Sequence, residues 1–437
     1  MNTQNTKKQL KQETLALHAG YAKDGEATLS VPIYQSTAYD FKSLERAANR
    51  FALKELGNIY TRLGNPTCDV LAKRLAALEG ADAAQLISAN VTASGTAAIL
   101  GAILTLAGAG ENILLSSKVY GGTATLCVHT LARFGIETRV FDIDDLDDLR
   151  AKIDDKSRAI LYESLSNPQI HVADIEAISK IADEFGIVSI CDNTVATPIL
   201  CRPFCWGADL VVHSLSKYIN GHANALGGAI IEAPKLNEKL VKNPRYALFN
   251  EPDPSYHGLV YKDLAPDFGI FSLRVKLEFL RNLGASASPA NAYYQILGLE
   301  TLALRMRSHS ENAAALAEFL AAQGAVKAVF YPSINQKELS AKYLPQGASG
   351  LLSFELEGEE AAREFCAGVP IFAVCANIGD TKSLLIHPAS TTHGQLSEAE
   401  KAKAGISAGL VRLSVGIESV EDLKNALGQG FKALSCQ

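Results

Sequence analysis

The chain has 437 residues, of which 48% are hydrophobic, so it is long enough to bury large cores in more than one domain. Its formal net charge is −6 and no long block of Lys or Arg appears, which argues against a nucleic-acid partner. No apolar run reaches the length of a membrane span, and the N-terminus lacks a secretory signal. Eight cysteines are scattered without a disulfide or zinc framework, so we expect a cytoplasmic protein with no metal site.

The N-terminal segment contains few periodic stretches, yet it is too long for an ordinary surface loop. We interpret residues 1–60 as a polar, partly extended arm. A helix is predicted next, because Pro66 suits a first helical turn and Gly80 suits a helix end. We divide the rest of the chain into a large domain, residues 61–295, and a smaller α/β C-terminal domain, residues 296–437.

From residue 112 onward the hydrophobic pattern alternates between strand-like and helix-like periods. This alternation predicts an α/β fold with a mostly parallel sheet that helices cover on both faces. A dinucleotide-binding Rossmann domain has the same pattern, but no Gly-x-Gly-x-x-Gly follows the first strands. The expected strands are 113–115, 136–141, 159–162, 187–191 and 209–213, and the expected helices are 123–134, 146–153 and 175–185.

Two later segments shape the domain assignment. Residues 235–279 are irregular and contain several prolines, so we interpret them as an insertion rather than a core element. The aromatic residues of this insertion, such as Tyr256, either line an entrance to a site or pack over the surface. Residues 291–320 have apolar side chains at three- and four-residue spacing, which predicts a helical segment that leads into the second domain.

Polar residues follow two neighbouring apolar strands, which is typical of a ligand site in an open α/β sheet. Asp192 ends one apolar run, and Lys217 follows the next with Ser214 and Ser216 beside it. A nucleophilic lysine, a buried acid and phosphate-binding hydroxyls together favour pyridoxal 5'-phosphate as cofactor. Lys217 would form the Schiff base, Asp192 would pair with the protonated ring nitrogen, and both serines would bind the phosphate. The alternative is that Lys217 only begins a surface helix.

Two further segments can bind anions. Ser94-Gly95-Thr96 precedes an apolar helix, and small residues at a helix start leave backbone N–H groups free for an anion. An ordinary tight turn between a strand and a helix uses the same residues. Arg412 lies in a strand-like apolar run, where an unpaired charge is costly, so it needs a structural carboxylate or an anionic ligand.

The motifs around these residues resemble those of the Cys/Met-metabolism family of fold-type I pyridoxal-phosphate enzymes. The resemblance extends through nearly the whole chain and implies a fold-type I transferase. The motifs that carry it are Asp192-Asn-Thr, His213-Ser-Leu-Ser-Lys217-Tyr, Gly221-His222, Tyr60-Thr-Arg62, Val119-Tyr120-Gly-Gly122 and Val411-Arg412-Leu-Ser.

The resemblance also implies that the protein is a homo-oligomer. In this family the N-terminal arm reaches a neighbouring subunit, and Tyr60 and Arg62 would contact the phosphate of the neighbour's cofactor. A dimer with shared active sites follows from this, and we expect two such dimers to form a homotetramer.

Further roles within one subunit come from the same resemblance. Ser94, Gly95 and Thr96 would hold the cofactor phosphate, and Tyr120 would stack on the cofactor ring. Asn167 would contact the ring hydroxyl and also the substrate. The substrate itself would be bound by four residues, of which Arg412 takes the α-carboxylate: Arg412, Asn377, Asn167 and Tyr60.

The resemblance favours chemistry at the γ-carbon of an amino acid, with Lys217, Asp192 and Tyr120 as catalytic residues. We expect sulfide or a thiol to displace acetate from the γ-carbon of O-acetylhomoserine, an activated homoserine, and so to form homocysteine. Three features favour this reaction: the insertion at 235–279, Asn377-Ile-Gly-Asp in place of Ser-Leu-Gly-Asp, and Gly122 where methionine γ-lyases carry a cysteine. The alternatives are a cystathionine γ-synthase or a γ-lyase on the same scaffold, and a non-catalytic protein that keeps the fold.

Overall fold

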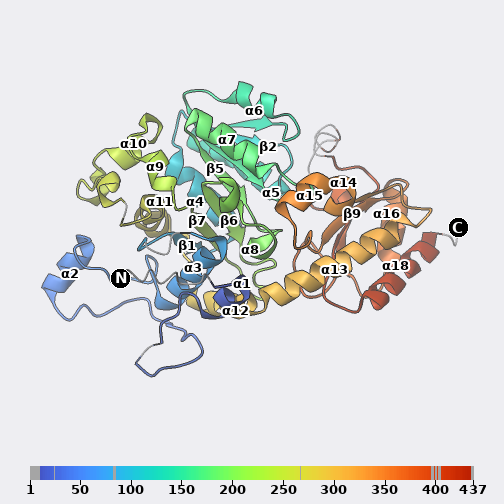
Figure 1. The fold of residues 1–437 in the computed structure, drawn as a ribbon, viewed down its shortest axis with the longest axis horizontal. Helices are drawn as coiled ribbons and strands as arrows, with labels where there is room; N and C mark the ends of the chain where they lie inside the picture. The colour runs from blue at the N-terminus through green and yellow to red at the C-terminus, as the bar shows by residue number, and fades with distance from the viewer. Residues whose placement is uncertain are drawn as a thin grey trace, which may run out of the picture.

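The structure is a computed structural model that describes residues 10–23, 25–81, 85–265, 267–394, 398, 401 and 405–434. The outer ends of the expected arm and of the expected C-terminal domain, residues 1–9 and 435–437, lie outside these residues. A seven-stranded sheet and a five-stranded sheet organise the chain. The long helix α13 (Leu302–Ala321) extends from the side of the larger sheet to the smaller one (Figure 1). Within the described residues, no helix is both long enough and apolar enough to cross a membrane.

The large sheet has the strand order β1-β7-β6-β5-β4-β2-β3. The five strands β6, β5, β4, β2 and β3 pair in parallel with their neighbours in this group. Strand β7 is antiparallel to both of its neighbours, β6 and β1. The expectation of a mostly parallel sheet is therefore confirmed. The strands are β1 (Ala89–Thr92), β2 (Asn112–Ser116), β3 (Glu137–Phe141), β4 (Ser157–Glu163), β5 (Val188–Asp192), β6 (Leu210–Ser214) and β7 (Gly228–Glu232).

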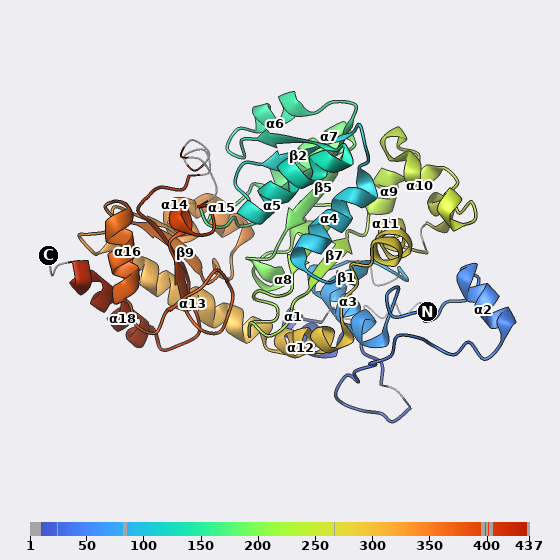
Figure 2. The same cartoon turned by 180° about the vertical axis from the view of Figure 1, so that it is seen from behind.

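Helices cover both faces of this sheet, which explains why the residues of its central strands β4, β5 and β6 are almost all buried. Successive residues of a strand point to opposite faces, so Leu161 and Tyr162 of β4 belong to different cores. Helices α3 (Pro66–Glu79), α7 (Ile175–Phe185) and α8 (Thr197–Leu200) pack on the face of Tyr162. Figure 2 shows α4 (Gly95–Leu106) and α11 (Ile270–Arg274) over the opposite face.

The interpretation of residues 235–279 as an insertion outside the core is wrong. Tyr246, Phe249, Tyr261 and Phe271 are no more than 2% exposed and share one core with α4 and the sheet. The sequence looked irregular because most of its helices are only one or two turns long, too short to establish a period. They are α9 (Leu236–Leu240), η4 (Pro244–Tyr246), α10 (Ala247–Asn250), η5 (Pro254–Tyr256), η6 (Tyr261–Leu264), α11 and η7 (Val275–Leu283).

Two predicted helices are divided in the structure. Residues 291–320 form α12 (Pro289–Glu300) and α13, which are separated at Thr301. The helix expected at 123–134 begins two residues earlier and consists of α5 (Gly121–Thr125), a π-helical turn η1 (Leu126–Thr130) and a 3-10 turn η2 (Leu131–Phe134). Side-chain periodicity does not separate these helix types over a few residues. The predicted α6 (Leu146–Lys152) and α7 agree with the structure within a residue.

The smaller sheet has the order β10-β11-β12-β9-β8. Only β10 and β11 pair in parallel. Its strands are β8 (Ala328–Phe330), β9 (Leu351–Glu355), β10 (Ala373–Val374), β11 (Leu384–Ile386) and β12 (Leu410–Ser414), and its helices include α14 (Pro332–Asn335), α15 (Lys337–Tyr343), α16 (Gly358–Gly368) and α18 (Val420–Leu434). Helices α13 and α18 lie together across this sheet (Figure 1).

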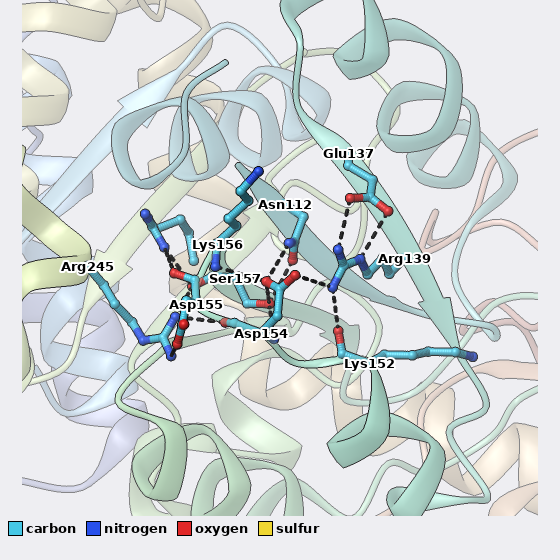
Figure 3. Close-up of polar contacts among 10 residues, drawn as sticks. Asn112, Glu137, Arg139, Lys152, Asp154, Asp155, Lys156, Ser157 and Arg245 are labelled. Atoms are coloured by element: carbon cyan, nitrogen blue, oxygen red, sulfur yellow. Dashed lines mark hydrogen bonds and ion pairs between the residues drawn. The ribbon is translucent and has the colours of Figure 1, made fainter. Parts of the chain in front are cut away.

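A polar cluster joins the amino ends of β2 and β4 (Figure 3). The Asp154 carboxylate accepts a hydrogen bond from Asn112 Nδ2 (2.8 Å) and pairs with Arg139 Nη1 (2.8 Å). Burial acts to raise the pKa of Asp154, but the hydrogen bonds from Asn112 and Arg139 hold it well below its ordinary value. This cluster lies at the end of the sheet opposite the carboxyl ends of the parallel strands, where ligands of open α/β sheets bind.

The N-terminal arm is partly attached to its own subunit. Helix α1 (Gln12–His18) packs against α3 and α12. Helix α2 (Leu44–Phe51), by contrast, has no buried residue and lies away from the body of the molecule (Figure 1). The expected contact between this arm and a neighbouring subunit stays a prediction.

Candidate active site

A cavity of about 260 Å³ lies where β4, β5 and β6 end, on the side that faces the smaller sheet. Glu163, Asp192 and Ser214 are the last residues of these three strands. Most residues that the sequence predicted for the site line this cavity: Ser94, Gly95, Thr96, Tyr120, Asn167, Asp192, Ser214, Ser216, Lys217, Asn377 and Arg412. Segments far apart in sequence therefore converge here, as expected for an α/β ligand site.

Asp192 is held at the floor of the cavity by its neighbours. Its Oδ1 accepts a hydrogen bond from the N–H of Thr194 (2.9 Å), and Thr194 Oγ1 accepts one from the N–H of Ser214 (2.7 Å). Burial raises the pKa of Asp192, against the opposing effects of Thr194 and His213. A nearby cation would offset this burial and keep the carboxylate ionised.

Lys217 lies in the turn that follows β6, and its amine points into the cavity. Its Nζ donates to Asn377 Oδ1 at 2.6 Å. Burial, and then the positive charge of Arg412, lower the pKa of Lys217. A lower pKa increases the fraction of the neutral amine, which is the nucleophilic form.

Arg412 is buried in β12, at 4% exposure, and its partners are uncharged. Its Nη1 donates to Asn167 Oδ1 (3.0 Å) and its Nη2 donates to the carbonyl of Asn377 (3.0 Å). Its Nε has no hydrogen-bond partner among the described residues. Burial lowers the pKa of Arg412 to about 10, so it stays charged at neutral pH. This guanidinium is therefore prepared to bind an anion that enters the cavity.

The start of α4 provides a second anion-binding feature. Ser94 caps the helix by accepting a hydrogen bond from the N–H of Ala97 (3.1 Å), and the first helical N–H groups have no partner inside a helix. A Cβ on Gly95 would lie 2.5 Å from Ser214 Cβ, so only glycine allows α4 to approach β6 so closely. This approach places Ser94, Thr96 and Ser214 on one wall of the cavity.

Glu163 has a role that the sequence did not reveal. Its Oε1 accepts from the N–H of Tyr120 (2.7 Å) and its Oε2 accepts from the N–H of Asn167 (3.2 Å), so it orients both loops. Burial, and then the charge of Asp192, raise the pKa of Glu163 well above its ordinary value. Both contacts are to backbone amides, so Glu163 acts on the loops and not through an ion pair. Tyr120 itself is 47% exposed at the cavity mouth.

A second buried cluster lies beneath the strand ends. Glu79 Oε1 accepts from Asn193 Nδ2 (3.0 Å) and lies 2.6 Å from His213 Nε2. All three side chains are fully buried. His213 and Asn193 belong to the motifs noted above, but Glu79 is far away in sequence, so no local pattern could have paired it with them.

Tyr60 and Arg62 do not line the cavity of their own chain. The Arg62 guanidinium donates to the carbonyl of Arg281 and lies 5.4 Å from the centre of the Tyr60 ring. Both side chains are exposed. Their assignment to the cofactor of a neighbouring subunit stays a prediction.

The residues present fit pyridoxal 5'-phosphate. The unpartnered Arg412 Nε is suited to the carboxylate of an amino-acid substrate, and the Gly95 approach creates an anion site that suits the cofactor phosphate. Asp192 supplies the acid, and Lys217 supplies an amine of lowered pKa. These groups line one cavity.

A model of the family described as Cys/Met metabolism PLP-dependent enzymes, where PLP is pyridoxal 5'-phosphate, matches residues 13–432. The chain belongs to this family, and PLP is therefore its cofactor. The expected fold-type I architecture is confirmed as well.

Individual relatives are similar to this chain along nearly their whole length. An O-acetyl-L-homoserine sulfhydrylase of Leptospira meyeri is 44% identical over 435 residues, which cover 97% of each chain. An O-acetyl-L-homoserine sulfhydrylase of Thermus thermophilus is 45% identical over 96% of this chain and 99% of its own. A crystal structure of an O-acetylhomoserine (thiol)-lyase of Campylobacter jejuni, with N'-pyridoxyl-lysine-5'-monophosphate, has a TM-score of 0.94 and 53% identity and covers 97% of this chain and 100% of its own.

Proposed function

We propose that this protein is a PLP-dependent transferase that converts O-acetylhomoserine and sulfide, or a thiol, to homocysteine, or its thioether, and acetate. The observation that carries this proposal is the convergence of Lys217, Asp192 and Arg412 on one cavity. The relatives named above are O-acetylhomoserine sulfhydrylases, and their similarity covers both sheets, which supports the choice of substrate. The product places the enzyme in the biosynthesis of sulfur-containing amino acids.

Each residue of the cavity has a separate role in the proposed reaction, which follows from its position. When bound, PLP supplies an electron sink that stabilises negative charge beside the amino group of the substrate. Asp192 keeps a proton on the ring nitrogen, and Arg412 holds the substrate carboxylate. Lys217 would move protons at Cα and Cβ of the substrate, and Asn377 Oδ1 accepts a hydrogen bond from its amine. Tyr120, which lines the mouth of the cavity, would transfer a proton on the γ-side.

The overall substitution occurs at the γ-carbon. The bond between Cγ and the ester oxygen breaks, and acetate leaves with the electron pair. A bond between Cγ and sulfur forms, and the proton of sulfide is released or passed to a protein base such as Tyr120. No oxidant or reductant is required.

The active site that we propose is shared between subunits. Tyr60 and Arg62 would complete the cofactor site of a partner, since both are exposed and neither lines the cavity of its own chain. The arm also exposes apolar side chains, such as Leu29 (86% exposed) and Leu44 (90% exposed), which favours its burial against another subunit. We propose a dimer with shared sites and its further association into a homotetramer.

We also propose the domain limits and a cytoplasmic location. The arm is assigned to residues 1–60, the cofactor-binding domain to 61–295 and the C-terminal domain to 296–437. Among the described residues the cysteines are free, which suits a reducing compartment.

Substrate competition tests the proposed reaction. Purified protein is incubated with O-acetyl-, O-succinyl- or O-phosphohomoserine and sulfide, and homocysteine is measured. We expect the acetyl ester to react fastest. Faster formation of cystathionine from cysteine would favour a cystathionine synthase, and dominant release of ammonia from methionine would favour a γ-lyase. The absence of turnover with all of these would favour a non-catalytic scaffold.

A further inference from the structure

Arg305 is a buried cation outside the cavity. It lies near the start of α13 and is 5% exposed. Its Nη1 donates to the carbonyl of Tyr218 (2.7 Å), and its Nη2 donates to the carbonyls of Ile219 (3.1 Å) and Gly298 (2.7 Å). Its Nε donates to Thr301 Oγ1 (3.2 Å). None of these acceptors carries a formal charge, although a buried guanidinium usually requires an anion.

Two of the acceptors belong to the residues that directly follow Lys217. This segment, Tyr218–Gly221, forms a turn that a hydrogen bond closes: the N–H of Gly221 donates to the carbonyl of Lys217 (2.8 Å). Its shape therefore fixes where the Lys217 side chain begins. The fork of Arg305 binds this turn from outside the cavity.

Glycines bring the partners together. A Cβ on Gly298 would lie 2.4 Å from the carbonyl oxygen of Ile219, and a Cβ on Gly221 would lie 2.2 Å from Arg305 Nη1. The backbone of α12 and the turn after Lys217 are thus in direct contact. Gly221 also has φ +76°, which side chains rarely adopt.

The smaller sheet contacts the same turn from another side. The N–H of Thr381 donates to the carbonyl of Gly221 (2.9 Å), and a Cβ on Gly379 would lie 2.5 Å from the Tyr218 nitrogen. Gly379 follows Asn377, whose side chain accepts the hydrogen bond from Lys217. The turn is held between α12–α13 and the 377–381 segment, and both of these lead to the smaller sheet.

We propose that Arg305 is a positioning residue for Lys217, which fixes the turn Tyr218–Gly221 and links it to the junction of α12 and α13. This inference rests on the proposed function, because it takes Lys217 as the lysine that binds the cofactor. Arg305 does not line the cavity, so its effect passes through the backbone of the turn. A planar guanidinium suits this task because it donates several hydrogen bonds in a fixed geometry, which an ammonium group does not.

A purely structural arginine would stabilise the fold without affecting the lysine. Arg274 is a control of equal burial, because it is also 5% exposed and donates to a backbone carbonyl, that of Leu248. It differs from Arg305 in that it also pairs with Glu278 (2.7 Å). Its guanidinium lies over the rings of Phe249 (5.6 Å) and Tyr261 (5.0 Å), and it does not line the cavity. Arg305→Lys and Arg274→Lys make the same chemical change at a comparable depth.

The test compares both variants with the unchanged full-length protein. Thermal denaturation of the cofactor-free proteins measures stability, and cofactor affinity is measured by titration with PLP, followed by absorbance. We expect both variants to lose stability, but only Arg305→Lys to bind PLP more weakly, by at least about tenfold. With saturating cofactor its kcat should fall by at least about tenfold while KM changes by less than about threefold.

A milder variant covers the case in which Arg305→Lys does not fold. Thr301→Val removes the acceptor of Arg305 Nε, together with the hydrogen bond that Thr301 Oγ1 donates to the carbonyl of Gly298 (3.4 Å), and keeps the shape of the side chain. We expect it to weaken PLP binding and kcat in the same direction, by a smaller factor. Unchanged PLP affinity and kcat in a folded Arg305→Lys protein, or in Thr301→Val if only that variant folds, would overturn the proposal.

The identity of the cofactor lysine is checked separately. Borohydride reduction of the unchanged holoenzyme, followed by peptide mapping, should place the pyridoxyl group on Lys217. A label on another lysine would reject the role of Lys217 and, with it, this inference. A label on Lys217 together with unaffected Arg305→Lys kinetics would reject the inference alone.

Discussion

The cavity contains both acidic and basic side chains, so a bound cation would lie near a carboxyl group and a bound anion near a basic group. Asp192 and Glu163 are neighbouring carboxyl groups with raised pKa values, and Lys217 and Arg412 are cations with lowered ones. Burial is the largest cause of each shift. Ligands that carry the complementary charge reverse this cost, so binding and ionisation are coupled at single residues.

Lys217→Ala should remove the covalently bound cofactor and essentially all turnover. The reason is that no other lysine lines the described cavity. Absorbance and borohydride reduction measure the bound cofactor, and homocysteine formation measures turnover. A reducible adduct at a different lysine in this variant would contradict the assignment.

Asp192→Asn should keep the fold and part of the cofactor but lose activity by at least about tenfold, because an amide does not hold a proton on the ring nitrogen. The measurements are PLP content by absorbance and the rate of homocysteine formation. Asp209→Asn is a suitable control, because Asp209 is buried but accepts from Lys239 and Ser189 outside the cavity. Near-normal activity of Asp192→Asn would count against the role of Asp192.

Single residues differ in how well the sequence predicted them. Lys217, Asp192 and Arg412 stand out because each is a charged residue at the end of, or within, an apolar run. Glu163 also ends a strand, but its partners are backbone amides, which leave no trace in the sequence. Glu79 was missed because its partner His213 comes from a distant segment, and only the folded chain brings them together.

Among the elements, β7 ends in a carboxyl group that the site does not use. Glu232 is fully buried, and its Oε2 accepts from the N–H of Ser272 at 2.5 Å at the α11 segment. Its Oε1 has no hydrogen-bond partner among the described residues. Burial raises the pKa of Glu232 to about 8. The element therefore tolerates the protonated acid better than the carboxylate.

Stability should depend on pH through Glu232. The unfolded chain releases this proton near the ordinary glutamate pKa, whereas the folded chain keeps it up to about pH 8. Stability should therefore fall as pH rises through this window, by up to about 1.4 kcal/mol per pH unit, and level off above it. Glu232→Gln should remove this part of the dependence.

Thermal denaturation between pH 5 and pH 9 measures the effect, with pH intervals chosen around the pKa of about 8. Glu238→Gln, on the exposed side of α9, serves as the control. We expect the difference between Glu232→Gln and the unchanged protein to grow with pH. A constant difference would show that Glu232 does not titrate in this window.

Helices and strands that are long enough to show a regular spacing of apolar residues were predicted well, and short ones were not. Four of the five strands expected in the large sheet, β2, β4, β5 and β6, are runs of mostly buried residues, and α7 has buried residues at helical spacing. The helices of residues 235–279 are too short for that, so the sequence did not show that their aromatic residues belong to the core. Thr301 divides α12 from α13 although the apolar spacing continues across it.

At the scale of the whole molecule, the proposed site would be completed by residues of a second chain. Mixing inactive Arg62→Ala and inactive Lys217→Ala chains should restore part of the activity, because a mixed dimer has one site with both residues intact. Activity is measured after dissociation and reassembly, and subunit exchange is verified by mass spectrometry of tagged chains. No recovery despite verified exchange would contradict the shared site.

The antiparallel strand β7 has a consequence for how the site forms during folding. Ser214 of β6 pairs with Gly228 of β7 across a short loop that carries Lys217, whereas Ala89 of β1 pairs with Ile231 of the same strand from a distant part of the chain. Closing a short loop costs less entropy than closing a long one. We expect the lysine turn to form before β1 brings the start of α4 to the cavity. Pulse-labelled hydrogen exchange during refolding should therefore protect β6 and β7 amides before those of β1, so the cofactor phosphate site would be completed last.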